Sequence, residues 1–196
     1  MNEVSRDITH AVGFLQTAYT ILLALALGEA FRQFILDRAE QNIQWNRLPA
    51  LLGFLFLIFP FFHGMSRYFF VTYLTVGTDP THYAAYLMFD GIVFMCLSAF
   101  FFGMSRSLSS GHWRQYYCFL LLLLFVDSIW VSVAIWRGIQ LKPWLILNVA
   151  LAAVLLIVFG LFRKKHDSLG PPIICATTIF VTTLISYIKM SHFYFP

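Results

Sequence analysis

Six long apolar stretches, separated by short polar connections, constrain this chain more than any other feature. A helix needs about 20 apolar residues to cross the hydrocarbon core of a bilayer, and each stretch is long enough to do so. The stretches run over residues 14–35, 48–73, 84–103, 114–136, 144–162 and 172–193. The sequence therefore predicts an all-α polytopic membrane protein, a compact bundle of six transmembrane helices that forms a single domain over residues 1–196.

The connections between these stretches are rich in Gly, Pro, Asn, Asp and charged residues, as is typical of loops. None of them is long enough for a soluble domain, so we expect no extramembrane domain. The composition agrees, because 60% of the residues are hydrophobic and only 11% are charged, which is far from the makeup of a soluble protein. The partner that surrounds the chain is therefore a lipid bilayer.

Basic residues are spread along the chain and form no dense cluster, so nucleic acid is not expected as a partner despite the net charge of +4. Their distribution over the two membrane faces predicts an orientation. The first, third and fifth connections carry Arg32, Arg38, Arg47, Arg106, Arg114, Arg163, Lys164 and Lys165. The opposite face carries Arg6, Arg67, Arg137, Lys142 and Lys189. The positive-inside rule then predicts that both termini lie outside the cytoplasm, and we expect a bacterial inner (plasma) membrane.

Ionisable and polar residues inside the apolar stretches share one depth. Because successive helices alternate in direction, a residue late in an even-numbered span lies level with one early in an odd-numbered span. A charged side chain in hydrocarbon costs about 2.5 to 3.5 kcal/mol on insertion scales, so groups at one depth gain by pairing. The sequence predicts a polar layer in the half of the bilayer nearer the termini. Its candidate ligand- or ion-binding residues are His63, Arg67, Asp90, Asp127, Trp130, Asn148, Ser186 and Lys189.

Local spacing supports this layer. His63 and Arg67 lie four residues apart and share a helix face, and Pro60 opens the hydrogen-bond ladder one turn earlier. Asp127 and Trp130 are three residues apart, so the indole N–H is placed to orient the carboxylate. In the last span, a 4-4-3 spacing aligns polar side chains on one helix face, namely Thr178, Thr182, Ser186 and Lys189.

Each feature has a structural alternative. Thr and Ser in membrane helices often bond their own backbone, and Arg67 and Lys189 can extend to the headgroups. An Asp–Arg or Asp–His bridge that only fixes the helix order would also explain the buried carboxylates. Aromatic residues near the span ends are expected to form an interfacial belt, namely Trp113, Tyr116, Trp136 and Trp144.

Two features of the first span stand apart from the layer. Glu29 precedes Arg32 and Gln33, which predicts local pairing at the helix end, although a second gate of a pathway is the alternative. Small residues repeat at the spacing that allows close helix approach, as Ala24 with Gly28 and Ala26 with Ala30. They serve contacts within the bundle or between protomers, and we expect a homo-oligomer.

No metal or other cofactor is expected. Only His63 among the histidines is deep in a span, and no H-x-x-x-H or H-E-x-x-H pattern occurs. The three cysteines are isolated, and no nucleophilic-serine motif is present. An intramembrane enzyme that uses His63 with Asp90 or Asp127 as an acid–base pair stays open as a third reading.

Two functions from different classes therefore compete. In the first, the bundle binds or conducts a small solute or ion through the polar layer. In the second, the layer is structural, and the protein is a membrane sensor or effector subunit, for example of a stress or defence complex. Such a subunit would dock its partner through loops with basic residues, namely Arg38, Arg47, Arg163 and Lys164.

Overall fold

The computed structural model describes residues 3–35, 45–75, 83–108, 113–162 and 170–195. All regular structure in these ranges is helical. The long helices are α1 (Glu3–Ile35), α2 (Leu48–Phe69), α3 (Tyr83–Ser107), α4 (Trp113–Trp136), α5 (Lys142–Leu161) and α6 (Gly170–Lys189). Three short helical turns flank them: the 3-10 turn η1 (Trp45–Arg47) before α2, the π-helical turn η2 (Phe70–Thr75) after α2, and α7 (Ser191–Tyr194) after α6.

Six of these helices are long and apolar enough to cross a membrane, which confirms the predicted fold. The bounds differ at the two ends of the chain. The first helix begins at Glu3 rather than at residue 14, because residues 3–13 contain no Pro, and a helix interior tolerates the one glycine there, Gly13. The last span stops at Lys189, and α7 forms a separate turn where a continuous helix to residue 193 was expected.

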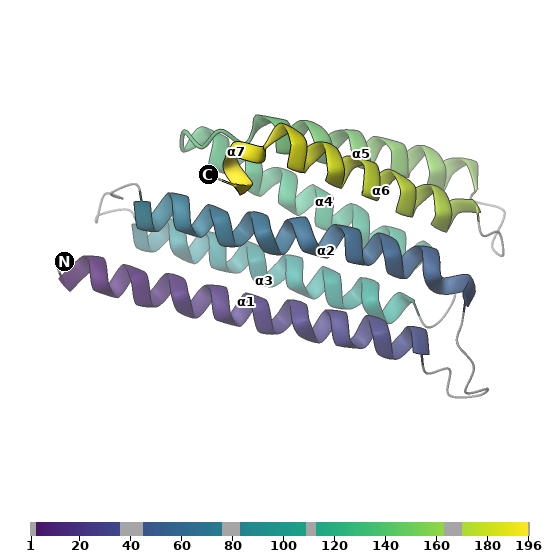
Figure 1. Cartoon of the computed structure of the whole chain (residues 1–196), viewed down its shortest axis with the longest axis horizontal. Coiled ribbons are helices and arrows are strands. Elements are labelled where there is room, and N and C mark those ends of the chain that lie inside the picture. The colour runs from purple at the N-terminus through teal and green to yellow at the C-terminus, as the bar shows by residue number, and fades with distance from the viewer. Residues whose placement is uncertain (1–2, 36–44, 76–82, 109–112, 163–169, 196) are drawn as a thin grey trace.

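The six helices form a closed ring. Each packs against two neighbours, in the order α1, α3, α4, α5, α6, α2 and back to α1. Figure 1 shows the N- and C-terminal ends of the chain at the same end of the bundle, together with the α4–α5 turn. We call this the terminal end of the bundle, and the other the distal end.

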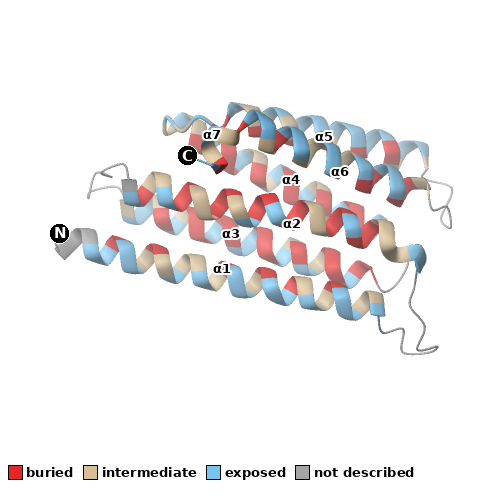
Figure 2. Ribbon diagram, viewed as in Figure 1, coloured by how far each residue is buried: buried red, intermediate tan, exposed pale blue. Residues whose placement is uncertain are grey.

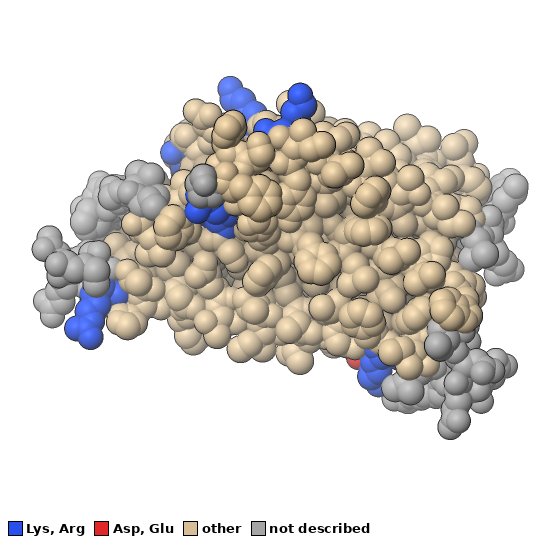
Figure 3. All heavy atoms as spheres, viewed as in Figure 1, with Lys and Arg blue, Asp and Glu red and all other residues tan. Residues whose placement is uncertain are grey.

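The surface of the bundle is that of a membrane-spanning protein. Buried residues line the faces that the helices turn toward one another, while exposed residues cover the outside (Figure 2). Large apolar side chains such as Phe14, Leu161 and Trp136 are among those exposed. On the face seen in Figure 3, Lys and Arg gather near the ends of the helices, and uncharged residues cover the middle. Because a lipid bilayer solvates such a band, the chain is an integral membrane protein.

The distal half of the bundle is filled by apolar side chains, which we call the apolar plug: Phe54, Phe101, Leu120, Leu123 and Leu124. Each of them is at most 1% exposed, and the rings of Phe54 and Phe101 meet edge to face with centroids 5.8 Å apart. Tyr116 of α4 donates a hydrogen bond to the Ala50 carbonyl of α2 at 3.3 Å. The plug thus joins opposite sides of the ring.

Two expectations for α1 are resolved. Glu29 pairs locally with Arg32, at 2.8 Å, and accepts a hydrogen bond from Gln33, as the spacing predicts. Ala26 and Ala30 are fully buried, so this small-residue pair serves packing inside the bundle. Ala24 and Gly28 lie on the exposed side of the helix.

Candidate functional site

Asp90 of α3 is fully buried and is the centre of a hydrogen-bonded group at the terminal end. Its Oδ2 accepts hydrogen bonds from the hydroxyls of Tyr68, at 2.9 Å, and Tyr73, at 2.5 Å. Its Oδ1 accepts one from the indole N–H of Trp130, at 3.0 Å. These donors come from α2, η2 and α4, so the Asp90 group joins α3 to its neighbours.

The π-helical turn η2 explains how both tyrosines reach Asp90. Residues five apart on an α-helix point about 140° away from one another, which would direct Tyr73 away from the side of Tyr68. In a π-turn the hydrogen bonds run from i to i+5, so the wider turn brings residues five apart to the same side. The irregular end of the second span therefore completes the Asp90 group.

Arg137 supplies the positive charge. Its Nη1 lies 3.2 Å from Asp90 Oδ1 and 3.2 Å from the Tyr68 hydroxyl, and its guanidinium stands 4.2 Å from the centre of the Tyr86 ring. Burial opposes the charge, but Asp90 together with Tyr68 and Tyr73 outweighs it, so the pKa of Arg137 is raised. The guanidinium is therefore held charged, with its Nε buried and without a partner among the described residues.

The end of α4 places Arg137 at this position. Ile139 N–H bonds the Ala134 carbonyl and Gly138 N–H bonds the Ile135 carbonyl, which is the Schellman arrangement. It requires a left-handed residue after the helix, and Gly138 has φ +92°. Glycine meets this requirement without strain, so α4 stops there and Arg137 turns back over Asp90.

Asp127 of α4 is the centre of a second group. Its Oδ2 accepts hydrogen bonds from the indole N–H of Trp144, at 2.8 Å, and from the Asn148 amide, at 2.5 Å. Trp144 and Asn148 lie four residues apart on α5, so both face α4. The expected pairing of Asp127 with Trp130 is wrong, since the Trp130 indole bonds Asp90 instead.

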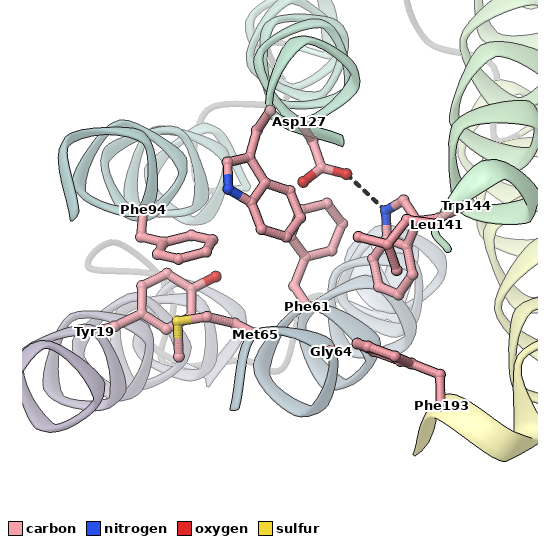
Figure 4. Close-up of a pocket in the computed structure, with 10 residues that line it drawn as sticks. Tyr19, Phe61, Gly64, Met65, Phe94, Asp127, Leu141, Trp144 and Phe193 are labelled. Atoms are coloured by element: carbon pink, nitrogen blue, oxygen red, sulfur yellow. Dashed lines mark hydrogen bonds between the residues drawn. The ribbon is translucent and has the colours of Figure 1, made fainter. Parts of the chain in front are cut away.

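One oxygen of Asp127 faces the interior of a pocket that we call the inner pocket (Figure 4). The pocket is lined by Tyr19, Phe61, Gly64, Met65, Phe94, Asp127, Trp130, Leu141, Trp144 and Phe193. Its cavity volume is about 10 Å³, which is the room of about one water molecule. The Tyr19 hydroxyl is buried and has no partner among the described residues, so a polar occupant would satisfy it.

His63 and Arg67 lie away from both carboxylates, on the side of α2 that meets the last residues of the chain. Arg67 Nε donates to the Phe193 carbonyl at 2.8 Å. His63 stands among aromatic rings, with centroids 5.0 Å from Tyr194 and 5.8 Å from Tyr187. Their shared helix face is thus used to hold α7 against the bundle, and the expected Asp–Arg bridge is made by Arg137.

The polar stripe of α6 divides between two roles. Thr178 and Thr182 hydrogen-bond carbonyls of their own helix, as the structural alternative predicts. Ser186 is buried and lies 3.3 Å from the Tyr194 hydroxyl, while Lys189 is exposed at the helix end. Thr182 and Ser186 also line a cavity of about 30 Å³ beside Asn148, which we call the lateral pocket.

A larger cavity of about 1050 Å³ opens at the terminal end, and we call it the vestibule. It is lined by Val71, Thr72, Tyr73, Tyr86, Ile135, Arg137, Gly138, Ile139, Gln140, Lys142, Pro143, Lys189, Met190, His192 and Phe193. This volume is in the range of small-molecule sites.

The three cavities adjoin one another. Phe193 lines both the vestibule and the inner pocket, and Phe61 and Trp144 line both the inner and the lateral pocket. Phe193 thus lies between the vestibule and the inner pocket, and Phe61 and Trp144 lie between the inner and the lateral pocket. Toward the distal end, a further small cavity between Pro49, Trp113 and Cys175 has no room for water.

Several residues of this arrangement were missed from the sequence. Arg137, Tyr68 and Tyr73 were not among the candidates, because a connection arginine and tyrosines in an apolar run look like interfacial anchors. Trp144 and Tyr116 were assigned to the aromatic belt, which is wrong, since they are 8% and 2% exposed. Trp144 lies two residues after the start of α5 and one helical turn before Asn148. This spacing places both side chains on one helix face, which was the available signal that Trp144 belongs to the polar layer.

Other predictions concern ligands and loops. Within the described residues, no three His, Cys, Asp or Glu side chains are grouped as a metal ion would require. Among the basic loop residues expected to bind a partner, Arg38, Arg163 and Lys164 lie outside the described residues. Arg47 donates to the Gln33 carbonyl at 3.1 Å, which joins η1 to the end of α1.

Comparisons with known protein families, with curated proteins and with solved structures found no match to this chain.

Proposed function

We propose that this multi-pass membrane protein binds a small solute in the terminal half of the bundle. The solute enters through the vestibule. The inner pocket with Asp127 is the deepest part of the site whose structure changes when the solute binds. The observation that carries the proposal is the row of adjoining cavities, which is wide at the terminal end and narrows toward buried carboxylates. Concave sites with a few converging polar groups are the usual form of small-molecule sites.

Binding from one face is favoured over free conduction. The apolar plug fills the distal half, and its members are at most 1% exposed. An ion or polar solute would have to lose its hydration there without polar partners, which is costly. Passage across the membrane would therefore require the helices around the plug to separate, as in an alternating-access cycle.

Solute binding can be followed by the indoles of the inner pocket. Purified full-length protein in nanodiscs is titrated with a panel of small neutral, anionic and cationic solutes, and the total tryptophan emission, to which Trp130 and Trp144 contribute, is recorded. We expect a saturable change for at least one class, and loss or strong weakening of it in Asp127→Asn or Phe193→Ala. Phe14→Ala on the lipid face is the matched control and should leave the titration unchanged.

A liposome flux assay with the same solute separates binding from transport. A saturable titration without flux identifies a receptor, and flux that Asp127→Asn abolishes identifies a transporter. If no solute class changes the emission or crosses the membrane, the proposal fails.

A second candidate is a sensor or effector subunit whose polar layer is structural. The observation in its favour is the complete satisfaction of Asp90, which accepts bonds from Tyr68, Tyr73, Trp130 and Arg137. A carboxylate with so many fixed donors can hold helices in place without any ligand. Such a subunit would act through protein partners or a homo-oligomer.

Charge reversal at the distal loops tests this second candidate. In cells that depend on the protein, Arg47→Glu, Arg163→Glu and Lys164→Glu should abolish the phenotype while Asp127→Asn preserves it. If the loop variants keep the phenotype and Asp127→Asn abolishes it, the solute site is favoured.

A further inference from the structure

We propose that the vestibule binds an anion, a phosphate or carboxylate group, with Arg137 at its base. This inference rests on the proposed function and names the chemical class of the solute. Three observations support it: the basic side chains that line the cavity, the unused hydrogen-bond donors of Arg137, and the position of the vestibule at the terminal end of the bundle.

The charged side chains that line the vestibule are all basic. These basic side chains are Arg137, Lys142 and Lys189, and His192 adds a further nitrogen donor. No acidic residue is among the lining residues that the structure describes. They come from three segments, because Arg137 follows α4, Lys142 begins α5, and Lys189 ends α6. The ring of helices thus gathers like charges in one cavity, and like charges repel unless an anion separates them.

Arg137 distinguishes this cavity from an ordinary basic surface. Its side chain is 9% exposed, yet it lines the vestibule. Its bonds to described protein acceptors use Nη1, and its Nε is buried, so Nη2 is the nitrogen whose donors remain for an anion in the vestibule. A guanidinium that is held rigidly and keeps unused donors is suited to a planar or tetrahedral oxyanion.

The buried carboxylate offsets part of the Arg137 charge but is shielded from the vestibule. Asp90 shares its negative charge with two tyrosine hydroxyls and an indole N–H besides Arg137. It is fully buried behind them, so a solute in the vestibule meets Arg137 rather than Asp90. The first turn of α5, whose backbone N–H groups begin at Lys142, adds a positive helix end on the same side.

Two sources can supply such an anion at the membrane surface: a dissolved phosphate or carboxylate, or the phosphate of an anionic lipid headgroup. Both bring the same oxygens to the same donors. They differ in the tail, because a lipid needs a path from the vestibule to the bilayer.

The experiment compares the two sources on purified full-length protein. In nanodiscs of phosphatidylcholine at constant ionic strength, Tm is measured with added inorganic phosphate, with tetramethylammonium and with glycerol. A second set of nanodiscs contains phosphatidylglycerol without added phosphate. We expect Tm to rise with inorganic phosphate or with phosphatidylglycerol.

Charge removal locates the effect. Lys142→Gln and Lys189→Gln should each weaken the stabilisation, with the midpoint of the phosphate titration shifted roughly three- to tenfold. Arg6→Gln is the matched control, since it removes one positive charge at the same end of the bundle but outside the vestibule. Asp90→Asn, which releases Arg137 from its partner, should tighten phosphate binding in protein that remains folded.

The outcomes distinguish a dissolved anion, a lipid headgroup and the absence of an anion site. Saturation with phosphate supports a dissolved anion, and an effect limited to phosphatidylglycerol supports a lipid headgroup. If tetramethylammonium or glycerol binds with dependence on vestibule residues and the anions do not, the anion proposal is wrong while the proposed function stands. Equal sensitivity of Arg6→Gln and Lys142→Gln also refutes the vestibule as the anion site. If no probe of any class binds, both proposals fail.

Discussion

At the scale of single residues, the two buried carboxylates differ in how they are held. Asp90 is paired with a cation and bonded by three further side chains, whereas Asp127 is bonded by an indole and an amide and has no ion pair among the described residues. The first arrangement fixes α2, α3 and α4 to one another. The second joins only α4 to α5, and leaves one carboxylate oxygen turned to the inner pocket.

Asp90→Asn should destabilise the bundle by about 3 kcal/mol, because it leaves the Arg137 charge buried without its partner. The free energy of unfolding is measured by urea titration in micelles. The double variant Asp90→Asn with Arg137→Gln should lose less than the sum of the single losses, since both charges are then absent. Additive losses would show that the pair is not coupled.

Gly64→Ala should also destabilise the protein, by about 1 to 3 kcal/mol. A Cβ at residue 64 would stand 2.8 Å from the Trp144 ring, so the indole must move and its bond to Asp127 weakens. A lowered Tm and a shifted Trp emission would report both effects. Gly13→Ala is the control, because a Cβ there meets nothing within 4 Å, and the helix propensity of alanine should raise the Tm.

The sequence predicted which polar residues are buried better than it predicted which residues they bond. Short carboxylates inside apolar stretches cannot reach the headgroups, which is why Asp90 and Asp127 were recognised as buried. Their partners depend on helix rotation and on the turns at helix ends, and a single sequence carries little of either. The partner of Asp90 is thus Arg137, which was not among the candidates, because the Schellman turn folds it inward.

At the scale of the elements, Pro60 leaves a backbone carbonyl of α2 unpaired, and this carbonyl accepts a hydrogen bond from α6. Proline has no N–H, so the Phe56 carbonyl one turn earlier lacks its helical partner. The Thr183 hydroxyl of α6 donates to this carbonyl at 3.0 Å. The opening in the hydrogen-bond ladder predicted at Pro60 is therefore also the place where a hydrogen bond joins α2 to α6.

Thr183→Val should cost about 1 kcal/mol, since it leaves the Phe56 carbonyl unsatisfied inside the membrane. In a Pro60→Ala background the same change should cost little, because the N–H of the new alanine bonds that carbonyl. Unfolding of the four variants in micelles gives the coupling directly. An equal cost in both backgrounds would mean that the hydroxyl acts elsewhere, and Thr178→Val, which removes a bond within α6, serves as a control.

The element bounds were predicted well where apolar runs end abruptly, and poorly where helices continue beyond the bilayer. Hydropathy detects the membrane thickness, not the helix end, so Glu3–Ile35 was predicted as 14–35. The π-helical turn η2 has no marker in the sequence, since it depends on Tyr73 reaching Asp90.

At the scale of the whole molecule, the termini and the vestibule share one face of the membrane. If the positive-inside rule holds, that face is not cytoplasmic. We expect alkaline phosphatase fused to the C-terminus in a bacterial host to be active and a green fluorescent protein fused there to be dark. The opposite pattern would place the vestibule in the cytoplasm.

The closed ring has a consequence for how the protein is made. Because α2 and α6 are neighbours in the ring, α2 enters the bilayer well before its partner has been synthesised. During that interval the Phe56 carbonyl and the Arg67 side chain lack the groups that satisfy them in the finished protein. Until the last helix arrives these groups lack their protein partners, and unsatisfied backbone groups are costly in lipid, so the insertion of α6 and α7 stabilises α2 as well as closing the ring.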